Sequence, residues 1–412
     1  MPSGNLPDGR EGQAADAMRD RSAQVPGGES PPGTGESPVL PGKLMEIAQV
    51  WQEPAGFVLD YLQMNSSVTN FTFQSNMTYL VSGRVDLWGT TTFEGGAVIK
   101  VPPISGLILV ISDSSKSYAW CKTSPERPLV ITSRDDNSVG ETISGSTGSP
   151  SIWGDTNTLY LTLWAMSGLD IHDVRMLYAH SPLWLFASSG VMSNIQIDHS
   201  YYPFWGIGAN MSLRNILLHD VRSVGFWLNS STLSVEHMTV DSGGQLGENE
   251  SASSMTLTNS LLVGVQTLGN LPLTTNSVAI AGTNTPVFQS VGVGSHYLVT
   301  GSAYRDVGTA NINPVLLAAL QQMTTYPPPD SYADANALDL GFHYPRLTDW
   351  DNDGLEDGWE LRYFGNLGQT GSGNPDDDDA NNLTEFIQGR NPAAGAAPDN
   401  GATALKTFTP LK

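Results

Sequence analysis

The sequence has a single cysteine, Cys121, in 412 residues, and only 19 Lys and Arg residues against 41 Asp and Glu. One thiol excludes a disulfide framework and a cysteine-ligated metal site. The formal net charge of −22 disfavours nucleic acid and anionic membrane surfaces as partners. No run of about 18 apolar residues occurs, and residues 1–20 lack the apolar segment of a secretion signal. We therefore expect neither nucleic-acid binding nor membrane insertion.

Glycine and proline are plentiful, at 43 and 26 residues, and they divide the chain. Residues 1–42 are rich in Gly, Pro, Ser and Glu without a hydrophobic period, which predicts a disordered tail. Residues 43–64 predict a short helix interrupted at Pro54, and residues 393–412 predict a flexible tail. From about residue 66, β-branched or alternating segments between Gly and Asn breaks predict strands.

An internal repeat is the main feature of the sequence. Equivalent segments begin at Asp173, Asn194, Asn215, His237 and Asn259. Successive starts are 21, 21, 22 and 22 residues apart, a step too short for helix-pair repeats and suited to one turn of a coil of short strands. We predict an all-β fold, a right-handed single-stranded parallel β-helix (a solenoid) over residues 43–345. A β-sandwich would not explain the fixed step.

Alternation along the repeated strand assigns its two sides. Nine residues are predicted to point inward and stack as the core: Val174, Met176, Ile195, Ile197, Ile216, Leu218, Met238, Val240 and Leu262. Asn194, Asn215 and Asn259 are predicted at the preceding bend, where stacked amides can hydrogen-bond along the axis. Residues 312–323 predict a helix that caps the open end of the solenoid.

The last feature is acidic and regularly spaced. Residues 349–385 hold eleven acids and one base, Arg362. Residues 349–360 match the calcium-loop pattern D-x-D-x-D-G-x5-E, in which Gly354 permits the turn that brings the oxygen ligands together. A second copy spans 374–385, with Asp379 at the glycine position. The predicted Ca²⁺ ligands are Asp349, Asp351, Asp353, Leu355, Asp357, Glu360, Asn374, Asp376, Asp378, Ala380, Asn382 and Glu385.

These acidic strings, DWDNDGLEDGWELRYFGNLG and NPDDDDANNLTEFIQGRNP, resemble the paired calcium loops of dockerin-like and thrombospondin type 3-like modules on secreted bacterial proteins. Upstream segments such as TTTFEGGAVIKV and NINPVLLAALQQMTTYPP resemble β-helix proteins with the pectate-lyase-like fold from verrucomicrobia-like bacteria. The resemblance implies an extracellular or cell-surface protein in which residues 346–392 form paired EF-hand-like calcium loops. It supplies no catalytic activity.

The outward side of the repeated strand offers a catalytic candidate. Asp198, His219 and Asp241 fall at one position of three successive repeats, with His199 and Asp220 beside them. Three rungs about 5 Å apart would place an acid, a histidine and an acid together, an arrangement suited to proton transfer. The favoured alternative is that they are ordinary residues of a solvent-facing turn.

Aromatic residues offer a glycan-binding candidate. Trp184, Phe204 and Trp227 would form an exposed ladder, and stacked rings bind sugar faces. A register slip of one residue would place them in the core instead, and core packing is the favoured interpretation.

Two functions remain open. One is a non-enzymatic extracellular protein that binds calcium through its acidic loops and presents the solenoid surface to polysaccharides or cell-surface proteins. The other is a polysaccharide lyase or glycoside hydrolase acting on acidic polysaccharide. The first needs no unseen catalytic residues and is favoured.

Overall fold

The computed structural model describes residues 61–393, except 76, 105, 113–116, 152–157, 285, 292–293, 327–332, 335–336, 347–352, 357–358, 361–362, 365, 367, 378–379 and 389–391. The predicted tails, 1–42 and nearly all of 393–412, lie outside the described residues. So does most of the predicted N-terminal helix. Its last residues, Leu62–Met64, form a strand instead.

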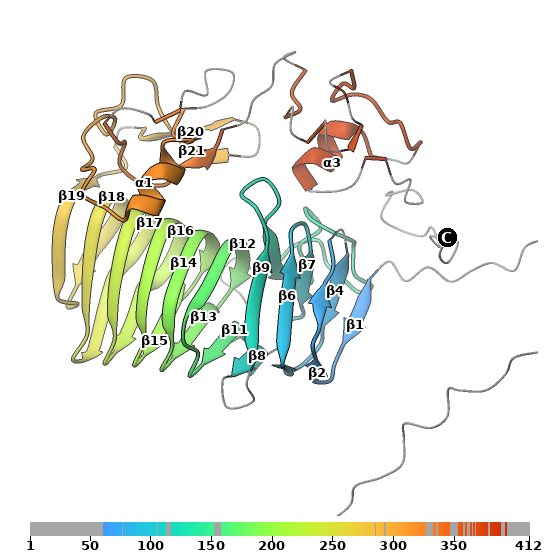
Figure 1. Cartoon of the computed structure of the whole chain (residues 1–412), viewed down its shortest axis with the longest axis horizontal. Coiled ribbons are helices and arrows are strands. Elements are labelled where there is room, and N and C mark those ends of the chain that lie inside the picture. Colours follow the sequence, from blue (N-terminus) through green and yellow to red (C-terminus); the bar gives the residue numbers. More distant parts are fainter. Residues whose placement is uncertain are drawn as a thin grey trace, which may run out of the picture. The chain divides into compact units, whose positions relative to one another are not determined.

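The described chain winds into a parallel β-solenoid whose coils have three faces, and its strands stack side by side (Figure 1). The early strands of the first face are β1 (Leu62–Met64), β4 (Thr78–Val81), β7 (Val98–Val101) and β10 (Leu129–Ser133). Those of the second face are β2 (Val68–Thr69), β5 (Val85–Trp88), β8 (Gly106–Ser112), β11 (Thr158–Trp164), β13 (Ser181–Phe186) and β15 (Phe204–Ile207). The third face begins with β3 (Thr72–Phe73), β6 (Thr90–Glu94) and β9 (Tyr118–Lys122).

Later strands are long because they run around corners from the third face into the first, and the longest of them continue into the second face. They are β12 (Leu169–Ala179), β14 (Ser189–Ser200), β16 (Asn210–Asn229), β17 (Thr232–Ser251), β18 (Ser254–Gly269) and β19 (Leu273–Ala281). The sheet of the third face is interrupted once. The β3–β6–β9 sheet is separate from the sheet that contains β12, although Thr123 Oγ1 donates to the carbonyl of His172 across the break at 2.6 Å.

The repeated polar residues form the corner between the third and first faces. Asp173, Asn194, Asn215, His237 and Asn259 all have φ between 50° and 57°. This left-handed conformation is costly for most residues and least so for Asn, Asp and His. The predicted amide ladder is present in part, because Asn194 donates to Asp173 at 2.8 Å and Asn215 donates to Asn194 at 2.9 Å.

The predicted inward residues form the core. All nine are at most 2% exposed and belong to one hydrophobic cluster that runs through the solenoid. In the register of β14, β16 and β17, Ile195 lies beside Ile216, which lies beside Met238. Burial of like residues in successive coils therefore sets the register, since a slip of one residue would turn every one of them outward.

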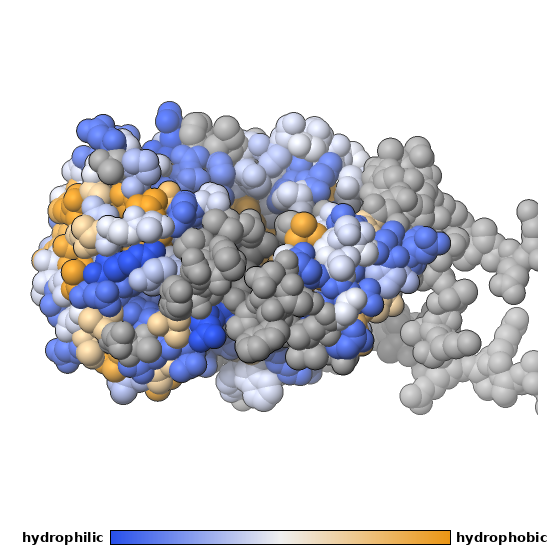
Figure 2. Space-filling view, turned by 90° about the horizontal axis from the view of Figure 1, so that it is seen from above, coloured by the Kyte–Doolittle hydropathy of each residue, from blue (hydrophilic) through white to orange (hydrophobic). Residues whose placement is uncertain are grey.

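Parallel strands end at Ala281, earlier than the predicted limit of 345. The described residues of 286–345, here called the cover segment, lie over the outer side of the first face. They include β20 (Phe288–Val291), β21 (Gly294–Leu298), β22 (Met323–Thr324), β23 (Tyr344–Pro345) and helix α1 (Pro314–Leu320). Seen from above, hydrophobic residues gather at the end of the solenoid where β19 lies (Figure 2), and Ile280 of that strand is 61% exposed.

Helix α1 forms within the predicted range 312–323. Asn313 caps its N-terminus by accepting from the amides of Val315 and Leu316. The amide of Asn313 donates to Glu236 of β17 at 2.9 Å. The helix thus lies beside β17, rather than beyond the last strand as predicted.

The cover segment follows the solenoid axis near its C-terminal end. Three consecutive amides bond to three successive coils: Gly341 to the Asn259 carbonyl, Phe342 to Thr239 Oγ1 and His343 to Asn215 Oδ1. The corner residues that shape the coils therefore also hold the cover segment.

Candidate functional site

The predicted acid–histidine–acid column is present on the first face. Asp198 of β14 lies in register with His219 of β16, which lies in register with Asp241 of β17. His219 Nδ1 is 2.7 Å from Asp198 Oδ1, and His219 Nε2 is 3.9 Å from Asp241 Oδ2. The parallel register brings these three side chains together because each occupies the same position of its coil.

A fourth member comes from the cover segment. His296 of β21 has its Nε2 3.0 Å from Asp241 Oδ2, and its imidazole contacts that of His219 with ring centroids 4.9 Å apart. Its side chain is only 3% exposed, against 33% for His219. Sequence reasoning left His296 without a role, because it lies 55 residues beyond Asp241 and outside the repeat.

The next corner adds two more titratable groups. His199 and Asp220 have φ of 53° and 47° and follow directly after Asp198 and His219. His199 Nδ1 is 2.7 Å from Asp198 Oδ1, and His199 Nε2 is 3.7 Å from Asp220 Oδ2. Three imidazoles and three carboxylates, which we call the His/Asp cluster, thus lie at the edge of the cover segment.

In four members of the cluster the pKa is shifted in the direction that favours the charged form. Burial raises the pKa of Asp198, but its contacts with His199 and His219 outweigh burial and hold that pKa well below its usual range. Burial lowers the pKa of His219, while contact with Asp198 outweighs this and raises it overall. Contact with Asp198 likewise raises the pKa of His199. Burial raises the pKa of Asp241 and contact with His296 lowers it, with a net decrease. Protonated His219 is therefore better suited to donate a proton than to abstract one.

Among the described residues, two groups of this cluster could hold a metal ion: Asp198, His199 and His219, and His219, Asp241 and His296. A third group is Asp306, Asp334 and Asp339. Its oxygens already accept bonds from neighbouring protein groups, including the Asp306 amide on Asp339 and His343 Nε2 on Asp334. We therefore attribute a structural role to the third group, in which its hydrogen bonds hold the cover segment together.

The aromatic ladder is present, with one correction. Trp184 of β13 lies beside Trp205 of β15, which lies beside Trp227 of β16. Phe204 was predicted in this ladder, but it is 1% exposed and stacks on Phe226 in the core at 5.0 Å. The predicted alignment was wrong by one residue in this coil, so the outward ring belongs to Trp205.

The outward rings contact one another along the second face. Ring centroids are 6.0 Å apart between Trp184 and Trp205 and 5.1 Å apart between Trp205 and Trp227. Trp164, 37% exposed, lies in register with Phe186 and packs edge-on against Trp184 at 5.7 Å. All three ladder residues are half-buried, so each side chain is accessible to solvent only in part.

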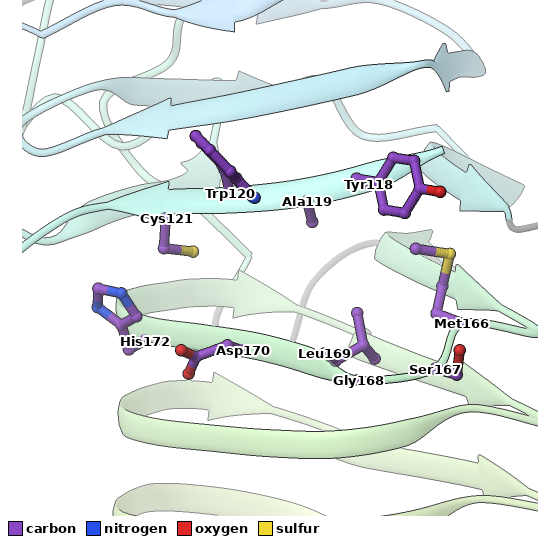
Figure 3. A pocket seen from close by; sticks show the side chains of 10 residues that line it. All are labelled: Tyr118, Ala119, Trp120, Cys121, Met166, Ser167, Gly168, Leu169, Asp170 and His172. Carbon is purple, nitrogen blue, oxygen red and sulfur yellow. The ribbon is translucent and has the colours of Figure 1, made fainter. Parts of the chain in front are cut away.

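A cleft of about 320 Å³ lies at the break in the third face, between β9 and the start of β12 (Figure 3). Tyr118 and Trp120 of β9 line it and are 58% and 62% exposed. Across the gap, β12 contributes Asp170 and His172 (Figure 3). This cleft could not be predicted from the sequence, because the break interrupts the repeat rather than following it.

His172 has a fixed position in the cleft. Its Nδ1 lies 2.7 Å from Asp173 Oδ2 and 3.2 Å from Thr123 Oγ1. Hydrogen bonding to Asp173 raises the pKa of His172. Burial raises the pKa of the Cys121 thiol, which also lines the cleft, to about 11. The thiol is thus protonated at neutral pH and unsuited to act as a nucleophile.

The acidic loops are described in part. Predicted ligands Asp349, Asp351, Asp357 and Asp378 lie outside the described residues, as does Asp379. In the first loop Gly354 has φ of 93°, the left-handed turn that the pattern requires, and the amide of Leu355 donates to Asp353 Oδ1 at 2.9 Å.

Both loops lead into helical segments that contact each other. Glu360 and Glu385, the last ligand position of each loop, are 0% and 1% exposed. The second loop leads into helix α3 (Asn382–Gln388), and Trp359 packs on Phe386 of that helix with ring centroids 5.4 Å apart. The predicted ligands Asn374, Asp376, Ala380 and Asn382 lie in or just before the start of α3.

No helix among the described residues is long and apolar enough to cross a membrane. Comparison with known proteins finds no matching family model, no curated protein of significant similarity and no solved structure of significant similarity. The resemblance to secreted bacterial β-helix and calcium-loop proteins therefore stays a prediction, and the chain is identified by its architecture alone, as a parallel β-solenoid.

Proposed function

We propose that this β-solenoid binds glycans in the cleft between β9 and β12. The observation that carries the proposal is the pairing of two exposed aromatic rings, Tyr118 and Trp120, with a carboxylate and an imidazole across a cleft of about 320 Å³. Aromatic faces pack on the C–H faces of sugar rings, and a few placed polar groups then select hydroxyl patterns. The cleft volume falls in the range of small-ligand sites.

The polar groups of the cleft favour neutral sugars. The residues that line it in the described part of the chain include Asp170 and His172 but no Lys or Arg. An acidic polysaccharide would meet the Asp170 carboxylate without a permanent cation to offset it. The exposed carboxylate of Asp170 can instead accept hydrogen bonds from sugar hydroxyls. The Trp184–Trp205–Trp227 ladder on the second face offers a further stacking surface for a longer chain.

Binding is tested by affinity electrophoresis and calorimetry of the full chain against neutral and acidic polysaccharides. We expect saturable binding to a neutral glycan, and an affinity about tenfold weaker in Trp120→Ala, which corresponds to about 1.4 kcal/mol. Trp88→Ala is the matched control, because Trp88 is 47% exposed and does not line the cleft. Equal affinity of wild type and Trp120→Ala would refute the assignment of the cleft.

The same samples test the enzymatic alternative. Cleavage of the bound polysaccharide is detected as new chain ends. If wild type cleaves the polysaccharide and both Asp198→Asn and His219→Ala abolish the cleavage, the binding-only proposal is wrong. Proton donation by His219, favoured by its raised pKa, is the specific step that such activity would use.

We also propose that residues 346–392 bind Ca²⁺ as paired loops and that the protein works outside the cytosol. The left-handed turn at Gly354 supports this, because such a turn brings the oxygen ligands of a calcium loop together, and Glu360 and Glu385, at the last ligand position of each loop, are both buried. Extracellular loops of this kind bind at about 10⁻⁴–10⁻³ M, so calcium outside the cell would occupy them.

Removal of calcium is the test. We expect EDTA to make residues 346–392 sensitive to limited proteolysis and excess Ca²⁺ to restore protection. Glu360→Gln should remove that protection at millimolar Ca²⁺, while Glu126→Gln on an exposed turn of the solenoid should not. Unchanged cleavage with and without EDTA would exclude a calcium-ordered module.

A further inference from the structure

Two histidines of the His/Asp cluster aim the same ring nitrogen at one carboxylate. His219 Nε2 and His296 Nε2 lie 3.9 and 3.0 Å from Asp241 Oδ2. The three ligand atoms all lie within 4.8 Å of one another. Ligand atoms about 2.0–2.2 Å from a shared tetrahedral ion stand somewhat over 3 Å apart, so only a small contraction at His219 would close this triangle around a metal.

The opposite ring nitrogen of each histidine is held by the protein. His219 Nδ1 donates to Asp198 Oδ1 at 2.7 Å, which leaves its Nε2 as the atom directed at Asp241. His296 Nδ1 lies 2.7 Å from Ser295 Oγ, a hydroxyl that can either donate or accept. Metal-binding histidines usually have their second nitrogen fixed in this way, because the outer hydrogen bond sets the tautomer and the ring orientation.

We propose that His219, Asp241 and His296 bind a divalent first-row transition metal ion, of the Zn²⁺ or Co²⁺ class. Two imidazoles and one carboxylate suit such ions, whereas Ca²⁺ and Mg²⁺ prefer oxygen ligands alone. The site is therefore distinct in chemistry from the acidic loops. His219 is 33% exposed, which leaves one side of the site open to water or to another ligand.

The position of the site gives the ion a structural consequence. His219 and Asp241 belong to neighbouring coils, whereas His296 belongs to β21 of the cover segment. An ion bound to all three would link the cover segment to the solenoid, in addition to the bond from the His343 amide to Asn215 Oδ1 at 2.7 Å. Metal binding should consequently stabilise the folded protein against heat.

The test is calorimetry of the full chain with ZnCl₂ and absorption spectroscopy with CoCl₂, both in saturating Ca²⁺ so that the acidic loops do not contribute. We expect one ion per chain and the visible bands of Co²⁺ with mixed nitrogen and oxygen ligands. His296→Ala and the isosteric Asp241→Asn should weaken this binding at least about 100-fold. Asp198→Asn should weaken it about 10- to 100-fold through His219.

His180→Ala is the matched control, since His180 stacks on Tyr201 at a corner of the same solenoid and belongs to neither metal-binding group. It should bind the ion with wild-type affinity. Circular dichroism shows whether each variant is folded. If His296→Ala does not fold, Asp241→Asn still tests the proposal. Absence of saturable Zn²⁺ binding in wild type, or wild-type affinity in both folded ligand variants, would overturn the proposal.

Discussion

Asn215 is the residue whose removal should separate the cover segment from the solenoid. It is fully buried, with φ of 54°, and its side chain makes bonds in two directions. Along the axis its Nδ2 donates to Asn194 Oδ1 at 2.9 Å. Toward the cover segment, its Nδ2 donates to the His343 carbonyl at 2.8 Å and its Oδ1 accepts from the His343 amide at 2.7 Å.

Replacement by alanine has two costs. The buried backbone N–H and carbonyl of His343 would each lose a partner, at about 1–3 kcal/mol per group. Alanine in a left-handed conformation would add about 1 kcal/mol. We expect Asn215→Ala to lower the free energy of unfolding by about 4 kcal/mol. Asn215→Gly, which accepts the backbone conformation, should lower it by about 3 kcal/mol.

Urea unfolding followed by tryptophan fluorescence measures these differences, and limited proteolysis locates them. Asn194→Ala is the matched control, because Asn194 has the same backbone conformation and bonds to Asp173 and Asn215 only along the ladder. It should cost about half as much and leave the cover segment protected. If both alanine variants lose the same stability and show the same cleavage pattern, Asn215 does not hold the cover segment.

Two further predictions concern the core. Phe204→Ala should lower the free energy of unfolding in urea by about 3–5 kcal/mol, because the Phe204 ring is buried against Phe226. Trp184→Ala, on the outer side of the solenoid, should lower it by less than half of that. Equal losses would contradict the assigned register. Burial, followed by the proximity of His343, lowers the pKa of His237 well below 6.5, so the unfolded chain takes up this proton first as pH falls. The stability that neutral His237 contributes should be complete above about pH 6.5 and decrease below it by up to about 1.4 kcal/mol per pH unit. His237→Asn, which suits the same backbone conformation, should remove that slope. An unchanged slope in thermal unfolding from pH 7 to 5 would contradict the assignment.

The fold could be predicted because coil geometry imposes a step on the sequence. The left-handed corner restricts the residue type at Asn194, Asn215 and Asn259, and the core restricts the two alternate positions that follow. Together these constraints also fixed the stacking of Asp198, His219 and Asp241. Any feature that repeats once per coil is visible in the sequence for the same reason.

Features outside the repeat could not be predicted in this way. Phe204 and Trp205 are adjacent aromatics, and either fits the outward column unless the step from Trp184 is known to be 21 rather than 20 residues. His296 reaches the cluster through β21, which pairs antiparallel with β20 and shares no register with the coils. The cleft beside Trp120 depends on a missing strand pairing between β9 and β12, and hydrophobic spacing within each strand does not report it.

The left-handed corners also bear on how such a molecule changes during evolution. Each coil from Asn194 onward begins and ends at the same backbone conformation, so a duplicated or deleted segment of 21 or 22 residues would join its neighbours without a new turn. Gain of one coil between the cleft and the His/Asp cluster would increase their separation by about 4.8 Å, one strand spacing. Duplication or deletion of coils would therefore change the distance between the two sites in steps of one strand spacing, while the residues of each site stay the same.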